Sequence, residues 1–214
     1  MHEFFTKEQN KKTKEFINLA LEFNKTHNIF ARKGYEEVFQ KDVLDCAPLF
    51  NMIKEEESVI DLGSGGGFPG ILLAISLPNN PISLLESSSK KCYFLKTVIE
   101  KLSLKNTTTI NQTIKENNNL GVYDVITARA FAPIKKIIKL TKNNTHQKTK
   151  HILLKGKKKI IQEELKLINK NQYIYEIINK DTKEYERNIV VIKKQWIRLS
   201  QSPTKRAGLA KQPQ

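Results

Sequence analysis

Hydrophobic and polar positions along the chain repeat with two periods, which together predict an α/β fold. Short β-branched and apolar runs of strand length occur at 57–62, 81–86, 106–111, 122–127 and 150–155. Amphipathic runs with helical spacing occur at 69–77, 88–103, 133–142 and 158–169. Because helices separate most of the strands, a parallel sheet with right-handed crossovers is favoured.

Two further predicted strands, 173–179 and 188–194, close the pattern and are separated only by the short loop 180–187. So short a loop joins antiparallel neighbours, because a parallel pair needs a long crossover. We therefore expect a seven-stranded, mostly parallel sheet ending in an antiparallel hairpin. This is the Rossmann-like, doubly wound variant found in methyltransferases.

The chain before the first strand is predicted to be helical. Residues 3–27 carry an apolar stripe that includes Phe16 and Phe23, and a second helical stretch is expected at 35–53. We predict a helical cap over 1–55, packed on a catalytic domain over 56–195. Residues 196–214 contain Pro203 and Gly208 and are predicted to be a basic, flexible tail.

The glycine-rich segment after the strand Val59–Leu62 is the strongest chemical signal. Five of the eight residues from Gly63 to Gly70 are glycine, and the apolar run 71–75 follows. This pattern indicates a buried strand, a tight turn and a helix whose N-terminus faces a ligand. Glycine suits positive φ and lets a nucleotide approach the backbone closely.

Three interpretations of this loop are possible. The spacing Gly65-x-Gly67-x-x-Gly70 also satisfies the dinucleotide fingerprint, and Glu86 follows it at about the sequence spacing expected of a ribose-binding acid. A turn that binds no ligand is the third possibility. Asp61 at the strand tip would repel a pyrophosphate, whereas it would attract the sulfonium and amino groups of S-adenosylmethionine (SAM). SAM binding is therefore favoured, with Glu86 on the ribose hydroxyls.

Composition points to a polyanionic partner. The chain has 214 residues with 37 Lys and Arg against 22 Asp and Glu, a formal net charge of +15. A basic protein that neutralises the phosphates of a nucleic acid releases their counterions, which favours binding. Scattered lysines can instead reflect a compositional bias. The stretch from Lys193 to Gln214 has six basic residues and no acid. Neither a membrane span nor a signal peptide is expected, and the isolated Cys46 and Cys92 suggest no metal site, so a cytoplasmic protein is predicted.

The segment after the fourth predicted strand, 127–133, is expected to meet the methyl acceptor. It offers Arg129 as a fixed cation and Phe131 as a stacking surface, and it lacks the cysteine that attack on a pyrimidine carbon needs. The guanine N7 nitrogen has a free lone pair, so positioning alone could supply most of its catalysis. The alternative for Arg129 is a structural ion pair.

Several motifs, taken together, resemble one known family. They are Val-Ile-Asp-Leu-Gly-Ser-Gly-Gly-Gly-Phe-Pro-Gly-Ile from Val59, Leu-Leu-Glu-Ser-Ser-Ser-Lys-Lys-Cys-Tyr-Phe-Leu from Leu84, Ala-Arg-Ala-Phe-Ala from Ala128, Leu-Lys-Gly from Leu154 and Arg-Asn-Ile-Val-Val-Ile-Lys-Lys from Arg187. Over about 23–194 the chain resembles the glucose-inhibited division protein B family, the bacterial RsmG enzymes. The resemblance implies SAM-dependent methylation of guanine N7 in 16S ribosomal RNA, near the decoding centre, by a protein predicted to be monomeric.

The resemblance also implies roles for individual residues. It places Gly63, Gly65 and Phe68 against SAM, Glu86 on the ribose, and Ile114 with Lys115 around the adenine. Arg129 matches the arginine of the cofactor and acceptor site, and Lys155 faces the same cleft. The RNA-binding candidates are Asn24, Asn28, Lys157, Lys205 and Arg206, with helix-end capping as an equal alternative for the two asparagines. Asp42 and Cys46 stand where the family commonly has His and Ser.

Two other classes of function remain open from sequence. One is a SAM-dependent enzyme for a small molecule, against which the basic composition and the basic tail argue. The other is a non-catalytic RNA-binding protein, which would not need the glycine loop with Asp61 and Glu86.

Overall fold

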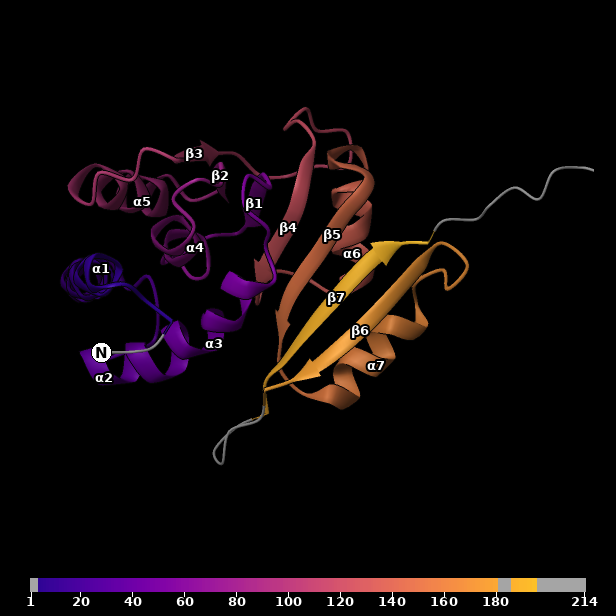
Figure 1. Ribbon diagram of the computed structural model, residues 1–214, viewed down its shortest axis with the longest axis horizontal. Helices are drawn as coiled ribbons and strands as arrows, with labels where there is room; N and C mark the ends of the chain where they lie inside the picture. Colours follow the sequence, from indigo (N-terminus) through magenta and orange to yellow (C-terminus); the bar gives the residue numbers. More distant parts are fainter. Residues whose placement is uncertain (1–3, 181–185, 196–214) are drawn as a thin grey trace, which may run out of the picture.

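Seven strands form one sheet in the order β3-β2-β1-β4-β5-β7-β6, with helices on both faces (Figure 1). The computed structural model describes residues 4–180 and 186–195. The strands are β1 (Val59–Leu62), β2 (Ile82–Glu86), β3 (Thr107–Asn111), β4 (Tyr123–Arg129), β5 (Thr145–Lys155), β6 (Tyr173–Asn179) and β7 (Asn188–Lys194). The seven-stranded sheet predicted from the sequence is confirmed.

Strand directions follow the expected pattern. β1 to β5 pair in parallel, whereas β7 is antiparallel to β5, with Ile152 opposite Val191, and β6 is antiparallel to β7. The hairpin is therefore confirmed. The largest difference in a strand boundary is at β5, which begins at Thr145, five residues before the predicted strand, and whose register with β4 shifts between Tyr123 and Val125. The extra residues are mostly polar, so they carried no hydrophobic signal.

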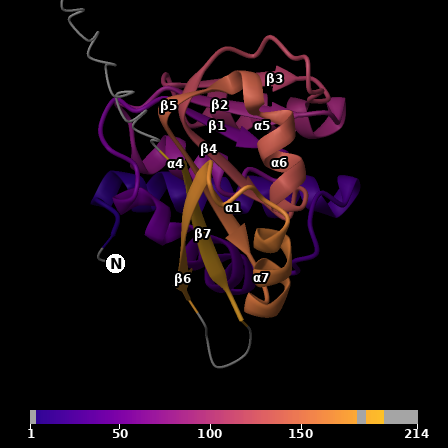
Figure 2. The same cartoon turned by 90° about the vertical axis from the view of Figure 1, so that its right-hand side faces the viewer.

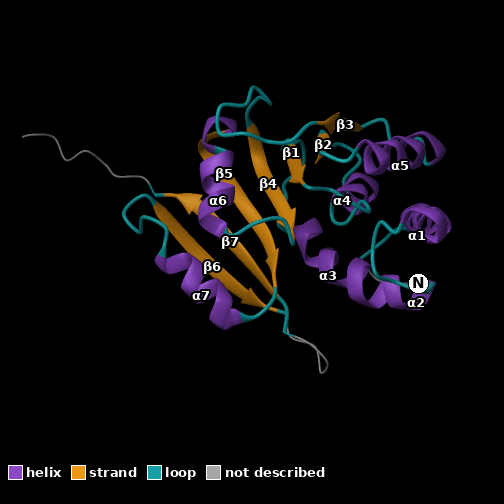
Figure 3. Ribbon diagram, turned by 180° about the vertical axis from the view of Figure 1, so that it is seen from behind, coloured by secondary structure: helices purple, strands orange, loops and turns teal. Residues whose placement is uncertain are grey.

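The two faces of the sheet have different helical covers. Helices α1 (Lys7–His27), α4 (Gly70–Ser76) and α5 (Ser89–Lys101) pack with one hydrophobic cluster, to which Val59 belongs. Helices α6 (Ile134–Leu140) and α7 (Lys158–Lys166) cover the other face, to which the next residue, Ile60, belongs (Figures 2 and 3). Alternation along each strand thus feeds two cores.

The N-terminal cap shares its core with the domain behind it. α1 starts at a capping box formed by Thr6 and Gln9, and it buries Phe16 and Ile17 completely within the cluster that also holds α4. The second helical stretch is confirmed but changes pitch along its length. Its segments are α2 (Tyr35–Val38), a π-helix (Phe39–Val43), α3 (Leu44–Cys46) and a 3₁₀-helix (Ala47–Asn51).

One buried histidine lies in β5, outside the predicted site. His151 is 4% exposed, and its Nε2 lies 3.0 Å from the Thr141 hydroxyl. That hydroxyl already donates to the Ile137 carbonyl, so the Nε2–H of His151 is the donor in this pair. Burial, together with the positive charge of Lys194, lowers the pKa of His151 to about 4.

We predict that His151 makes the fold sensitive to acid. The unfolded chain protonates this imidazole near its ordinary pKa and the folded chain only near pH 4, so the free energy of unfolding falls as the pH drops between these values. His151→Gln keeps an N–H donor but does not titrate. Urea unfolding of both proteins from pH 7.5 to 4 should show wild type losing on the order of 1–3 kcal/mol relative to the variant. Parallel stability curves would contradict this.

Candidate cofactor and acceptor site

The glycine loop leaves β1 at the carboxyl edge of the sheet. Gly63, Gly65 and Gly67 have φ values of +69°, +55° and +91°, so the predicted need for positive φ is met. A Cβ on Gly63 would lie 2.7 Å from Cδ2 of Phe131, and this close approach requires glycine. The Gly63 and Ser64 amides donate to the Leu85 carbonyl at 2.8 and 3.1 Å, which folds the loop over the end of β2.

Asp61 lies beneath this loop. It is 1% exposed, and its two carboxylate oxygens accept hydrogen bonds from the Gly70 amide at 3.2 Å and from the Thr127 hydroxyl at 3.0 Å. Burial raises the pKa of Asp61 to about 6, although these hydrogen bonds oppose the shift. The side chain lines neither cavity described below. Its direct contact with a cofactor therefore stays a prediction, whereas its support of the loop is observed.

Glu86 joins the loop to the end of β2. One carboxylate oxygen accepts from the Gly65 amide at 2.9 Å, and the other accepts from the Ser88 amide at 2.8 Å. Oε1 also accepts from the Ser87 hydroxyl at 3.5 Å, whereas Oε2 keeps a second lone pair, which a ribose hydroxyl could use. The carboxylate is thus oriented before any ligand binds, and its role on a ribose stays a prediction.

Two cavities meet at Gly63. The larger, of about 480 Å³, is lined by Ile29, Phe30, Arg32, Asp45, Gly63, Ser64, Gly65, Gly66, Phe68, Lys91, Arg129, Ala130, Leu154, Lys155, Gly156 and Arg187. The smaller, of about 240 Å³, is lined by Gly63, Leu85, Ser87, Gln112, Thr113, Ile114, Phe131, Ala132, Lys136 and Leu140. Five cations and a single acid line the larger cavity, whereas apolar side chains dominate one wall of the smaller.

Arg129 stands at the end of β4 in an ion-pair cluster. Its Nη1 donates to Asp42 Oδ1 at 2.7 Å and lies 4.0 Å from Asp45 Oδ2, and its guanidinium carbon lies 5.4 Å from the centre of the Phe68 ring. Arg32 makes two hydrogen bonds to the same Asp42 carboxylate. The structural ion pair considered for Arg129 is therefore present, and it coexists with a place in the cavity wall.

Lys155 is also held in place. Its Nζ lies 2.8 Å from a Glu164 carboxylate oxygen and donates to the Ala132 carbonyl at 2.9 Å. The same Glu164 oxygen accepts from the Ile134 amide at the start of α6. Lys155 thus fixes the turn between β4 and α6, and a direct catalytic role for it stays a prediction.

The turn after β4 contains a strained residue. Ala130 has φ +52°, a left-handed conformation that costs a non-glycine residue roughly 1 kcal/mol or more. It separates the side chains of Arg129, which lines the larger cavity, and Phe131, which lines the smaller. Phe131 therefore faces the side expected for the cofactor, although the sequence suggested it as a stacking surface for the acceptor.

The remaining predicted residues fall into three groups. Ile114 lines the smaller cavity, while Lys115 next to it is exposed. Asn24 accepts from the Phe30 amide and donates to the Arg32 carbonyl, so it serves the helix end. Asn28 and Lys157, like Lys115, are exposed and line neither cavity. RNA contact by any of these stays a prediction, and Lys205 and Arg206 lie outside the described residues.

Sequence reasoning missed most of the cation cluster. Arg32, Lys91 and Arg187 line the larger cavity, but Arg32 belongs to no motif that was singled out, and Lys91 and Arg187 were given no role although they stand in two of the family motifs. Asp42 was noted only as a departure from a family pattern. Its meaning depends on a contact with Arg129, 87 positions away, for which the local sequence holds no signal.

The described part of the chain holds neither a metal-binding cluster nor a membrane-spanning helix. Within residues 4–180 and 186–195, no group of three or more His, Cys, Asp or Glu side chains could hold a metal ion. No helix in the same ranges is long and apolar enough to cross a membrane.

Sequence comparisons give one consistent result. The family described as "GidB: rRNA small subunit methyltransferase G" matches residues 9–191. A "Ribosomal RNA small subunit methyltransferase G" of Brachyspira hyodysenteriae is 38% identical, over 86% of this chain and 92% of the relative. A protein of the same name from Ruthia magnifica is 32% identical, over 70% of this chain and 73% of the relative.

Solved structures share the fold at low identity. A precorrin-6y C5,15-methyltransferase from Geobacter metallireducens superposes with a TM-score of 0.58 at 14% identity, covering 79% of this chain and 93% of that one. A SAM-dependent O-methyltransferase from Thermotoga maritima has a TM-score of 0.56 at 16% identity, covering 73% and 67%. These likenesses support the methyltransferase fold alone.

We predict that the raised pKa of Asp61 makes the free energy of unfolding depend on pH. Its raised pKa means that the folded chain holds this proton up to about pH 6, so the free energy of unfolding falls as the pH rises from about 4 to 6. Asp61→Asn removes this slope and should gain stability relative to wild type across the window, by on the order of 1–2 kcal/mol. Urea unfolding at stepped pH measures the difference.

Asp124→Asn is the matched control, because Asp124 is a carboxylate with the opposite shift. Burial alone would raise the pKa of Asp124, but hydrogen bonds from Ser58 and His146 lower it overall. Its contribution to stability is therefore present above pH 4 and lost as the pH falls. If both variants changed the pH profile in the same direction, the assignment for Asp61 would be wrong.

Proposed function

Because the chain belongs to the rRNA small subunit methyltransferase G family and is therefore a methyltransferase with SAM as its methyl donor, we propose that its acceptor is the N7 nitrogen of a guanine in 16S ribosomal RNA. The observation that carries the proposal is the pair of cavities meeting at Gly63. One has an apolar wall and the other a cationic lining, and both open at the carboxyl ends of the strands, where this fold class binds ligands.

The residues present fit SAM. Ile114 and Leu85 offer an apolar wall for the adenine. Glu86 accepts from Gly65 of the larger cavity and stands between Leu85 and Ser87 of the smaller one in the chain, with a lone pair on Oε2 for a ribose hydroxyl. The glycine loop and Arg129 bound the larger cavity, where the methionine portion would lie. When bound, the cofactor supplies an electrophilic methyl group, and the residues named here hold it in place.

The lining of the larger cavity suits an acceptor that needs no general base. Among the described residues that line it there is no His or Cys, and its one acid, Asp45, lies 4.0 Å from Arg129 and 3.7 Å from Arg187. A guanine N7 lone pair is free at neutral pH, so no proton has to leave before methyl transfer. Alignment of N7 with the methyl group then accounts for most of the rate.

Arg129 is assigned an orienting role. Guanidinium is never deprotonated under ordinary conditions, and the pKa of Arg129 is raised further because the neighbouring carboxylates outweigh its burial. It cannot act as a base. Its planar donors can instead fix a carboxylate of the cofactor or a phosphate of the RNA.

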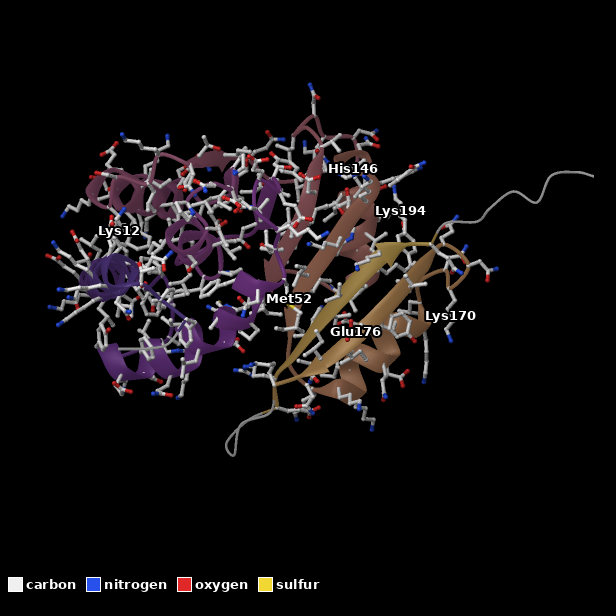
Figure 4. The ribbon with its side chains drawn as sticks, in the orientation of Figure 1. Lys12, Met52, His146, Lys170, Glu176 and Lys194 are labelled. Atoms are coloured by element: carbon white, nitrogen blue, oxygen red, sulfur yellow. The ribbon has the colours of Figure 1, made fainter. Side chains whose placement is uncertain are left out.

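We expect the basic tail to add affinity for a large RNA. β7 ends near the start of β5, where Lys194 Nζ donates to the Thr145 hydroxyl at 2.8 Å (Figure 4). Lys155 pairs with Asn188 at the other end of β7, about 20 Å away. β7 therefore leads the chain away from the cleft. A cytoplasmic location and a monomeric state stay predictions.

The N7 assignment predicts a reaction without a basic limb in its pH profile. The single-turnover rate with an rRNA fragment should be nearly flat from about pH 6.5 to 8.5, because no side chain has to lose a proton. A fragment with 7-deazaguanine at the target position should not be methylated, since carbon replaces the attacking nitrogen. Mass mapping of the product measures both. Equal methylation of the 7-deaza fragment would exclude attack by N7.

Arg129→Lys tests orientation against charge. Lysine keeps the positive charge but loses the planar fork, so we expect the single-turnover rate to fall by roughly 10²-fold, while SAM affinity changes by less than about tenfold. Stopped-flow turnover and calorimetric titration measure the two effects. Lys139→Arg, outside both cavities, is a control that alters another basic residue and should change neither quantity. A wild-type rate in Arg129→Lys would refute the orienting role.

A further inference from the structure

A carboxylate of the cap contacts two arginines that line the larger cavity. Asp42 lies in the π-helix Phe39–Val43, and it is 3% exposed. It accepts from Arg32 Nε at 2.8 Å, from Arg32 Nη2 at 3.2 Å and from Arg129 Nη1 at 2.7 Å. One buried anion therefore ties together an arginine of the cap and an arginine of the catalytic domain.

The local backbone is arranged to present Asp42. A π-helical turn rotates the side chains after it relative to an α-helix, and such turns are frequent at functional sites. The backbone of Arg32, the cap arginine that pairs with Asp42, is held as well, because the Asn24 side chain donates to the Arg32 carbonyl and accepts from the Phe30 amide. Both sides of the ion pair are thus held by backbone contacts within the cap.

Asp42 accepts a hydrogen bond from only one of the three guanidinium nitrogens of Arg129, Nη1. The face of the guanidinium lies over Phe68, at 5.4 Å from the ring centre, and the side chain is 23% exposed in the wall of the larger cavity. Among the described residues, Nε and Nη2 of Arg129 have no hydrogen-bond partner. These two atoms form the planar edge that binds oxyanions in a bidentate way.

We propose that Asp42 is a positioning residue that fixes Arg129 as an oxyanion-binding fork. The oxyanion is a carboxylate or a phosphate, which the cofactor and the RNA respectively can supply. This inference rests on the proposed function in assigning Arg129 to the reaction site. The cap thereby becomes part of the catalytic machinery, because the orientation of Arg129 depends on a side chain that α2 and the π-helix carry.

The charge balance shows why the carboxylate is needed. Arg32, Arg129 and Arg187 all line the same cavity; Asp42 pairs with Arg32 and Arg129, and Asp45 lies 4.0 Å from Arg129 and 3.7 Å from Arg187. Without the Asp42 charge, two nearby guanidinium groups would repel each other in a poorly solvated place. Arg129 would then move away from Arg32, and its free edge would leave the position that the ligand requires.

Asp42→Asn is the primary test, because it keeps the shape and removes the charge. Glu37→Gln is the matched control: Glu37 is also an ion-paired carboxylate of the cap, and its partner is Lys41 rather than Arg129. Asp42→Glu keeps the charge and should recover part of the lost function. Each protein is measured for melting temperature, for SAM and decarboxylated SAM binding by calorimetry, and for kcat and KM with an rRNA fragment.

The binding arms distinguish the two sources of the oxyanion. If the fork holds the cofactor carboxylate, Asp42→Asn should weaken SAM at least tenfold, leave decarboxylated SAM within about twofold, and so abolish the wild-type preference for SAM. If the fork holds an RNA phosphate, SAM affinity should stay within about twofold while KM for the RNA rises at least tenfold. Glu37→Gln should change neither quantity.

Asp42→Asn could leave Arg32 as an uncompensated buried charge and prevent folding. The double variant Arg32→Gln, Asp42→Asn removes both charges and should fold, while Arg129 still lacks its carboxylate. Wild-type affinities, kcat and KM in a folded variant of either kind would overturn the inference. The calorimetric arm needs no methylation, so absence of N7 methylation by the wild-type enzyme would refute the proposed acceptor separately.

Discussion

The buried carboxylate of Asp61 is the constraint on which the site depends. It accepts a hydrogen bond from Gly70 at the start of α4 and another from Thr127 in β4. These two contacts join the strand before the glycine loop, the helix after it and the neighbouring strand that leads to Arg129. The cost of burying the carboxyl group appears in its raised pKa. Because the loop cannot move independently of β4, the cofactor side and the acceptor side keep a fixed relation.

The topology explains why so few elements supply the site. β1 lies between β2 and β4, and their carboxyl ends carry the glycine loop, Glu86 and Arg129 respectively. The strained Ala130 directs its two neighbours into different cavities, so one turn serves two ligands. Strain of this kind persists only where surrounding contacts hold it, and Lys155 supplies one by binding the Ala132 carbonyl.

Local patterns were sufficient to predict the sheet and the loop but not the cluster around Arg129. Glycine spacing, β-branched runs and the short loop at 180–187 are properties of neighbouring residues, so the mostly parallel sheet and its closing hairpin followed from them. The polar start of β5 was missed because Thr145 to Thr149 is held by polar contacts, such as that of His146 with Asp124 and that of the Thr149 hydroxyl with the Tyr123 carbonyl, rather than by a hydrophobic face. The Asp42–Arg129 contact depends on how the cap docks, and buried ion pairs between distant segments leave no periodic signal.

The proposed N7 reaction has a consequence for product release. Methylation of N7 would leave a positive charge on guanine, whereas the unreacted base is neutral. In a cavity lined by Arg32, Lys91, Arg129, Lys155 and Arg187, that new charge is repelled, since the carboxylates nearby are already engaged with arginine or lysine. The same cations attract the phosphates on both sides of the base before the reaction. On the proposed reaction, the cleft would bind the RNA through its backbone and hold the methylated base less well than the unreacted base, which would promote release once the methyl group has moved.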